Sequence, residues 1–382
     1  NITGLPDINE SRIYLDLHQL RGTSAALEAT VKSFAPDSDL EISHLARGSE
    51  LRTSGIASGL LNDLKADVVA SLGAGYLRTG LRIGNLISTE KSITLEGDVL
   101  TRNFDIGRIL DSGLLRQCSL RTGFKADLGN RDDGIRLDID SLFIDRLNLN
   151  GYDYSKIAAA GTMEEHAFDG RIVCNDPNLN FMFQGVFSLS PRTRNAVYKF
   201  YANLGYADLN AMNIDRRGLS KISMQASANF NRQQDGDLLG TMDIADIVLE
   251  NSAGRYEIGD IDIDSYFGDE LYRMRLGSSF ADISFAGTAQ VTRFVQDLKN
   301  ITLKRELPAL FRDTTSTIHK DRYRIRYRNK NSMDLLAFLS PGLYISDSTS
   351  MDITVDTLGV FKADLVSPRI AFNENYIRNM EM

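Results

Sequence analysis

Between residues 151 and 265 the chain alternates apolar and polar residues with a period of two, in one short run after another. Residues 179–184 and 223–230 place apolar side chains at every second position, and 258–264 alternates apolar with small or acidic residues. Successive side chains on a strand point to opposite faces, so each run has one apolar and one polar face. Many such strands predict a long sheet with one continuous apolar face. What covers that face decides the function.

The alternating runs are separated by short turn signals rather than by long helices, which favours a mainly β fold with antiparallel, meandering connections over a parallel sheet. Hairpin turns are predicted at Asp169-Gly170, at 234–237 and at 252–254, and a further turn at 129–134. The predicted strands cover 12–18, 25–31, 39–43, 64–69, 76–83, 94–99, 120–128, 135–144, 238–249, 255–266, 271–276, 281–291, 322–328, 350–357, 360–366 and 370–372.

Three short segments have the spacing of amphipathic helices. Residues 103–118 carry an apolar stripe with Asp105 near its start, 293–312 carry a second, and 332–339 carry a third that ends before Pro341. The positions of these helices divide the chain into two predicted regions. Residues 1–290 form a β region with one short helix near 104–116, and residues 291–382 form a helix-containing segment followed by further strands.

Composition narrows the functional classes. The 382 residues suffice for two or three domains or for one elongated repeat-like architecture, and 42% apolar residues are typical of a folded chain. A net charge of −8 argues against a nucleic-acid partner. The sequence holds no apolar run long enough to span a bilayer. It begins at Asn1 within a strand-and-turn pattern, so we expect a fragment of a longer protein.

No group of residues indicates catalysis or metal binding. The acidic alternation of Asp260, Asp262 and Asp264 is more typical of a solvated strand face than of a calcium site. Motifs for a nucleophilic serine, a nucleotide-binding loop or a redox CxxC pair are absent, so no enzyme activity and no cofactor are expected. The four histidines are scattered and do not have metal-pair spacing: His18, His44, His166 and His319.

The two cysteines, Cys118 and Cys174, lie far apart in the sequence. One disulfide between them is conceivable, but they do not form a disulfide framework. The more ordinary interpretation is two small, partly buried apolar side chains.

The apolar side chains of the alternating strands are the candidate binding residues. They could line a groove that holds acyl chains, because a lipid tail needs apolar area and no directional partner. They could equally form the core of a closed β-sandwich. The candidate set is Phe181, Phe183, Met224, Phe230, Ile244, Ile261, Ile263, Phe280 and Phe285.

Two basic segments also admit two interpretations. The helix predicted at 293–312 could be a membrane-surface or lid helix, although packing on the sheet is more common. The strand at 322–328 places four guanidiniums on one face, which could meet lipid phosphates or could simply be a solvated, aggregation-resistant face. Those arginines are Arg322, Arg324, Arg326 and Arg328.

Three stretches carry a family resemblance. The first is LNGYDYSKI at 149–157, which leads into 161–163, 168–172 and 175–179. The second is LGTMDI at 239–244, followed by 255–258 and 261–265, and the third is LLAFLSPGLYIS at 335–346. Together they resemble the TamB-like proteins of Bacteroidetes, members of the AsmA-like group, over most of the chain.

The resemblance implies an elongated, curled antiparallel sheet, a taco-like β-groove with an apolar interior. Members of this family are anchored in the inner membrane by an N-terminal helix and cross the periplasm. A BamA-type outer-membrane partner receives their C-terminal end, and they are linked to outer-membrane protein assembly and to phospholipid transport between the membranes. The chain would then be an internal, periplasmic piece.

The expected function is therefore a non-enzymatic apolar groove for phospholipid acyl chains. The alternative is a scaffold that assembles outer-membrane β-barrel proteins by pairing strands at a free sheet edge. A carbohydrate-binding or adhesin-like sandwich is a weaker third possibility, and it predicts a closed core.

Overall fold

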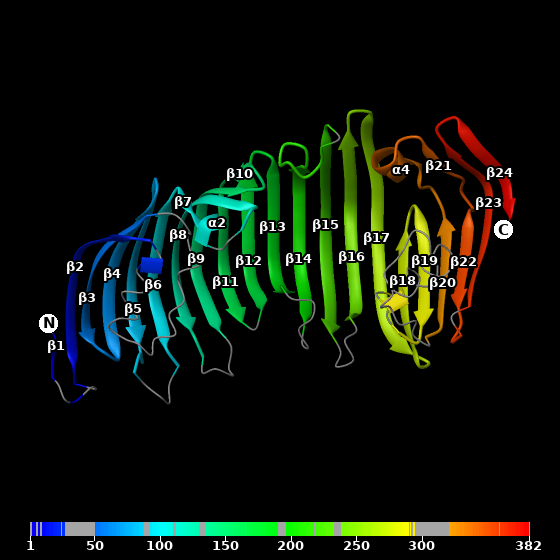
Figure 1. Ribbon diagram of the computed structural model, residues 1–382. Helices are drawn as coiled ribbons and strands as arrows, with labels where there is room; N and C mark the ends of the chain where they lie inside the picture. Colours follow the sequence, from blue (N-terminus) through cyan, green and yellow to red (C-terminus); the bar gives the residue numbers. More distant parts are fainter. Residues whose placement is uncertain are drawn as a thin grey trace. The chain divides into compact units, whose positions relative to one another are not determined.

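The protein is mainly β: in the computed structural model the described strands, 24 of them, belong to one antiparallel sheet, accompanied by two short helices (Figure 1). The antiparallel, mainly β class predicted from the sequence is confirmed. Contacts divide the chain into two units, residues 1–189 with 207–216 and residues 190–206 with 217–382. The structure describes residues 2–4, 7, 10–23, 25–26, 50–87, 92–109, 112–129, 135–164, 166–189, 196–216, 218–232, 238–289, 291, 293–294, 321–358 and 360–381.

In the first unit each long strand pairs with the next long strand along the chain. The two-residue β1 pairs with β2, while β7 and β10 add short pairings to β8 and β9. The strands are β1 Ile2–Thr3, β2 Arg12–Gly22, β3 Leu51–Leu60, β4 Asp63–Leu72, β5 Gly75–Gly84, β6 Thr94–Arg102, β7 Phe104–Asp105, β8 Leu115–Asp127, β9 Arg136–Leu149, β10 Tyr152–Tyr154, β11 Ile157–Glu164, β12 Ala167–Asp176 and β13 Leu179–Ser188, with helix α2 at Ile106–Ile109.

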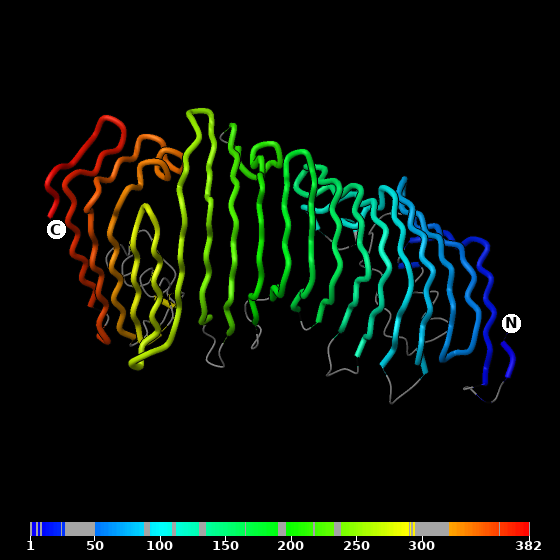
Figure 2. The backbone as a smooth tube through the Cα atoms, turned by 180° about the vertical axis from the view of Figure 1, so that it is seen from behind, coloured from blue at the N-terminus to red at the C-terminus, as the bar shows by residue number. Residues whose placement is uncertain are grey.

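The second unit repeats this meander. Strands β15 to β20 pair in chain order, followed by β22, β23 and β24, and the short β21 pairs with β23. Strand β14 lies beside β15 in both views (Figures 1 and 2). The elements are β14 Val197–Asp208, β15 Ser220–Arg232, β16 Leu238–Asn251, β17 Gly254–Gly268, β18 Leu271–Ser278, β19 Ala281–Gly287, β20 Tyr323–Asn329, α4 Met333–Leu339, β21 Leu343–Ile345, β22 Ser350–Val355, β23 Phe361–Phe372 and β24 Asn375–Glu381.

Two-residue turns explain why neighbours in sequence are neighbours in the sheet. Asn150 and Gly151 join β9 to β10 with φ of 52° and 76°. Asp269 and Glu270 join β17 to β18 with φ of 51° and 59°. Positive φ at both central positions is the type I′ geometry, whose twist matches that of paired strands. Such a turn leaves no room for a crossover, so the next strand must pair with the previous one.

The helix predicted at 103–118 is wrong except for its first turn. Among the described residues of this range, Ile106–Ile109 alone is helical. The Arg108 amide donates to the Asp105 carboxylate at 3.2 Å, so Asp105 does cap the helix start as expected. Residues from Leu115 onward belong to β8 instead. Leu115 and Cys118 lie opposite residues of β9, and this ladder satisfies backbone groups along the whole strand. Tertiary pairing has therefore overridden the helical spacing.

The turn predicted at Asp169-Gly170 is also wrong, because both residues lie inside β12, opposite Thr162 and Gly161 of β11. The chain instead turns at His166, between β11 and β12. A Cβ at Gly170 would collide with the Ala160 carbonyl oxygen and lie 2.7 Å from the Phe168 ring. The glycine therefore serves close packing under an aromatic ring rather than a turn.

Of the remaining local predictions, some are confirmed, some are wrong or missed a strand, and some concern residues that the structure does not describe. The turn at 252–254 and the helix at 332–339 are confirmed by the β16–β17 hairpin and by α4. Residues 370–372 end β23 rather than forming a last strand, and neither β3 nor β24 was predicted. The predicted strand at 39–43 and the predicted turn at 234–237 lie wholly outside the described residues. The same holds for most of the strand at 25–31, of the turn at 129–134 and of the helix at 293–312.

A buried carboxylate fixes the β10 and β12–β13 connections of the first unit. Asp176, 2% exposed, accepts hydrogen bonds from the amide and hydroxyl of Ser155, each at 2.8 Å, from the Asn178 amide at 2.9 Å and from the Tyr152 hydroxyl. Burial alone would raise the pKa of Asp176, but these donors stabilise the anion and hold its pKa below the ordinary value. The carboxylate is thus a structural clamp for these connections.

Candidate functional site

Register places the apolar side chains of the second unit in rows across one face of the sheet. Residues directly opposite each other on paired strands share a face, so each ladder can be followed from strand to strand. One row contains Ala228, Met242, Ile263, Leu276, Ile283, Tyr327, Met351 and Leu365. The adjacent row contains Phe230, Gly240, Ser265, Met274, Phe285, Ile325, Ile353 and Ala363. The face is apolar across at least eight strands.

Two irregularities preserve this face where alternation would otherwise fail. The β16–β17 register shifts between Ile244 and Ile247 and again between Ile247 and Val248. Asp246 has φ of 54° and Gly259 has φ of 82°, values that break the alternation of an extended strand. As a result Ile244 and Ile247 contribute to the same apolar cluster.

Short segments cover two parts of the face. Phe338 of α4 is 6% exposed and packs with Ile247, Leu249 and Ile258. Elsewhere the ring of Phe294 lies 5.2 Å from that of Tyr323, within a cluster on β19, β20 and β22. Other residues of the rows, such as Ile263 and Met242, remain partly exposed. Within the described part of the chain no second sheet lies on this face.

The first unit has an equivalent apolar face. One row runs Leu120, Ile144, Ile157, Cys174 and Phe181, and the next runs Leu142, Ala159, Ile172 and Phe183. Phe183 is 7% exposed, and its ring lies 6.3 Å from that of Phe168 and 6.4 Å from that of Phe187. Nearer the N-terminus, Leu15 of β2 lies opposite Ala57 of β3 on one face of the sheet. Its side chain is 55% exposed.

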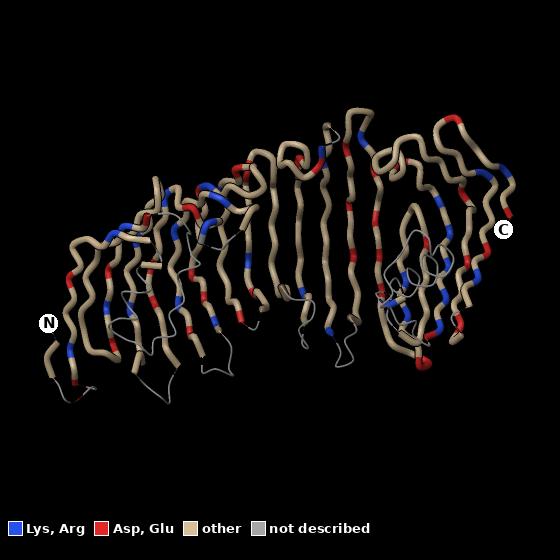
Figure 3. The backbone as a smooth tube through the Cα atoms, in the orientation of Figure 1, with Lys and Arg blue, Asp and Glu red and all other residues tan. Residues whose placement is uncertain are grey.

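The opposite face of the second unit carries charged pairs such as Asp264 with Arg275 and Arg326 with Asp352. Figure 3 shows where charged residues fall along the strands of this unit. Arg324 and Arg326 of β20 point to this face, beside Asp352 of β22. Arg324 donates to Asp352 from Nη2 at 2.6 Å and from Nε at 3.1 Å. These hydrogen bonds lower the pKa of Asp352 despite partial desolvation. Arg324 and Arg326 therefore belong to the polar face, where both lie beside Asp352. Whether the arginines of 322–328 meet lipid phosphates stays a prediction.

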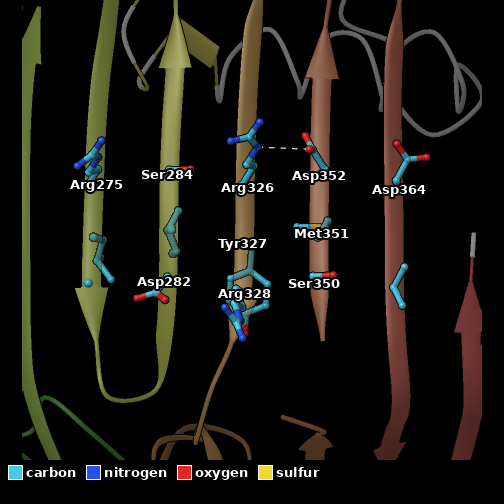
Figure 4. A pocket seen from close by; sticks show the side chains of 14 residues that line it. Arg275, Asp282, Ser284, Arg326, Tyr327, Arg328, Ser350, Met351, Asp352 and Asp364 are labelled. Carbon is cyan, nitrogen blue, oxygen red and sulfur yellow. Dashed lines mark ion pairs between the residues drawn. The ribbon is translucent and has the colours of Figure 1, made fainter. Parts of the chain in front are cut away.

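A hollow of about 530 Å³ lies on strands β18, β19, β20, β22 and β23 (Figure 4). Its charged lining is balanced, with three arginines and three aspartates: Arg275, Arg326, Arg328, Asp282, Asp352 and Asp364. The alternation places all six on the polar face. The lining also includes four members of the first apolar row: Leu276, Ile283, Tyr327 and Met351.

The structure brings the sequence-predicted residues together within each unit. In the second unit, Met224, Phe230, Ile244, Ile261, Ile263 and Phe285 lie on the apolar face, and Phe280, in the β18–β19 turn, packs against the Ile247 cluster. In the first unit Phe181 and Phe183 share a face. The prediction missed Met242, Leu276, Ile283, Tyr327 and Met351, although their period-two spacing was readable. Whether any of these residues contacts a lipid stays a prediction.

The described residues also bear on three other kinds of site: reactive cysteines, metal-binding clusters and membrane-spanning helices. Cys118 and Cys174 are both buried free thiols, and burial raises the pKa of Cys118 to about 11. No group of three or more His, Cys, Asp or Glu side chains in the described ranges is placed to hold a metal ion. Of the helices described, none has the length and apolar character needed to cross a bilayer.

No protein-family model, curated protein or solved structure matches the chain. The architecture alone therefore defines its class: a mainly β protein whose antiparallel sheet is apolar on one face and charged on the other within the second unit.

Proposed function

We propose that this chain is a non-enzymatic segment that carries phospholipid acyl chains on its apolar face. The observation that supports the proposal is the continuity of that face, row after row, without a second sheet over it among the described residues. A closed sandwich would pair such rows with those of another sheet about 10 Å away.

The chemistry of the face suits an acyl chain. A hydrocarbon tail gains about 25 cal/mol for each Å² of apolar surface removed from water and needs no directional partner. Rows of Ile, Leu, Met and aromatic side chains supply such surface, while charges on the other face keep the second unit soluble on that side. The headgroup would remain in water at the margin of the face.

The resemblance to TamB-like proteins supports the same proposal. In that setting the chain would act in the periplasm as an internal part of a longer protein. The full-length protein would be anchored in the inner membrane and would meet a BamA-type partner at the outer membrane. Movement of lipid would follow a gradient or a partner's action.

Extraction of co-purified lipid tests the proposal. The purified chain is extracted with organic solvent, and phospholipid is quantified by mass spectrometry for wild type, Phe183→Glu and Ile263→Glu. The control is Gln184→Glu, which places the same charge on the next residue of β13, at an exposed position. We expect lipid in wild type and in the control, and its loss in both face variants.

Two variants keep the test decisive. Phe183 is buried, so a charge there could unfold the unit, whereas Ile263 is partly exposed and tolerates a charge better. Folding of each variant is checked by circular dichroism. Absence of lipid from wild type, or equal lipid in a folded Ile263→Glu variant, would contradict the proposal.

One observation favours the alternative, a scaffold that pairs with client strands. Strand β24 is paired with β23, most of its residues are exposed, and no other described strand pairs with it. Unpaired N–H and C=O groups on a sheet edge can template another strand. Under this alternative Ile377→Pro would reduce client assembly more than Ile263→Glu does, and lipid content would be unchanged by either.

A further inference from the structure

Four arginines surround a small hollow on the polar face of the second unit, over strand β19. The hollow has a volume of about 300 Å³, and no Asp or Glu is among the residues that line it in the described part of the chain. Its floor includes the small side chains of Ser284 and Ala286, and its basic lining comprises Arg273, Arg275, Arg324 and Arg326.

The register of three strands creates this arrangement. Arg275 of β18 lies opposite Ser284 of β19, which lies opposite Arg326 of β20. The next row repeats the pattern, with Ala286 between Arg273 and Arg324. Small residues on the central strand leave space between two pairs of long guanidinium side chains. Figure 4 shows Arg275, Ser284 and Arg326 at the same level on successive strands.

Carboxylates outside the hollow hold some of these guanidiniums without neutralising all of them. Asp352 bonds Arg324 through Nε and Nη2 and lies 3.5 Å from Arg326. Asp269, which is 86% exposed, lies 3.0 Å from Arg273. Arg275 lies opposite Asp264 across β17 and β18. The four arginines therefore have three carboxylates nearby, and none of the three carboxylates lines the 300 Å³ hollow. The adjacent 530 Å³ hollow, in contrast, has equal numbers of both charges in its lining.

We propose that the hollow binds a phosphate group, taken either from a phospholipid headgroup or from a soluble phosphate. Guanidinium groups present planar pairs of N–H donors that match phosphate oxygens, and they remain charged at all physiological pH values. A tetrahedral phosphate can direct oxygens toward the arginines of β18 and of β20 at once. A carboxylate offers two oxygens in one plane. The Ser284 hydroxyl supplies a further donor at the floor. The four arginines lie on the face opposite the apolar rows, and Met274 and Phe285 of the second row also line the hollow. The proposal does not depend on lipid carriage.

Calorimetry and vesicle flotation test the site with two probes. Inorganic phosphate is titrated into the purified chain, and the chain is floated with vesicles of equimolar phosphatidylcholine and phosphatidylglycerol or of phosphatidylcholine alone. The test variant is Arg275→Gln/Arg326→Gln. The control is Arg255→Gln, an exposed arginine elsewhere on β17. Thermal unfolding verifies that each variant is folded.

We expect the double variant to weaken binding at least about tenfold, because each lost charge-assisted hydrogen bond contributes to affinity. Arg255→Gln should bind as wild type does. Arginine-dependent binding of inorganic phosphate identifies a soluble phosphate site. Arginine-dependent flotation with either vesicle, without binding of inorganic phosphate, identifies a headgroup site. Binding of neither probe by wild type, or equal binding by the double variant, would overturn the proposal.

Discussion

Ile244 of β16 lies directly opposite Ile261 of β17, and beyond this pair the two strands shift register while keeping their apolar side chains on one face. A strict period of two would have sent Ile247 or Ile258 to the polar face. The bulge at Asp246 and the left-handed backbone at Gly259 correct the phase. The Asp246 amide donates to Asp260 at 3.1 Å, which fixes the bulge. Continuity of the apolar face thus depends on two special backbone positions.

Gly259→Ala should lower the free energy of unfolding by about 1–2 kcal/mol, because a side chain is strained at positive φ. The φ of Gly259 is 82°, and an added Cβ would lie 3.1 Å from the Ser279 hydroxyl oxygen. Urea denaturation measures the change. Gly277→Ala is the matched control, since a Cβ there meets no atom within 4 Å and φ is not in the left-handed region. Equal stability of the two variants would show that Gly259 is not needed for the phase correction.

Phe338→Ala should destabilise the protein by about 3–5 kcal/mol, the usual range for a buried aromatic residue. Phe338 is 6% exposed and anchors α4 on Ile247, Leu249 and Ile258. Thermal and urea unfolding measure the effect. The control is Leu339→Ala on the same helix, where the side chain is 54% exposed and the expected change is below about 0.5 kcal/mol. A similar loss in both variants would mean that α4 is not anchored through Phe338.

Period-two alternation was sufficient to predict the class of fold, because it reports directly which side chains share a face. It predicted the strands of the second unit from residue 238 to residue 287 and the placement of residues such as Ile261 and Phe285. It could not predict bulges, since Asp246 looks like an ordinary polar residue in the sequence. Nor could it distinguish Gly170, which makes room for Phe168, from a turn glycine.

The short helix shows a different limit. Leu114 and Leu115 have helical spacing with Ile106, yet Leu115 begins β8, because pairing with β9 provides a ladder that a short exposed helix cannot match. The sequence could not predict the hollow lined by four arginines for a related reason. Arg275 and Arg326 are separated by a long stretch of chain, and only the pairing of β18, β19 and β20 brings them to the same level.

Asp176→Asn should lower the free energy of unfolding by about 2–3 kcal/mol near neutral pH, because an amide cannot accept all the hydrogen bonds from Tyr152, Ser155 and Asn178. The pKa of Asp176 is lowered in the folded protein, so the carboxylate contributes stability above its unfolded pKa of 3.8. That contribution is lost as the pH falls through the lower, folded pKa.

The difference between Asp176→Asn and wild type should therefore shrink as the pH falls below about 4. Urea denaturation across this pH range measures it. Asp169→Asn, at an exposed position of the same strand, is the control and should change little at any pH. A stability difference that stays constant into acid would show that the charge of Asp176 is not what holds the connection.

The two thiols should be unreactive in the folded protein. Cys118 is 1% exposed and Cys174 is 3% exposed, and burial raises the pKa of both, so little thiolate is present at about pH 8. Iodoacetamide labelling followed by mass spectrometry should show almost no modification of native protein. The same reaction in denaturant should label both residues, which also verifies that they are not disulfide-bonded. Rapid labelling of native Cys174 would mean that the apolar row containing Ile157 and Phe181 opens in solution, which would contradict a packed face at that position.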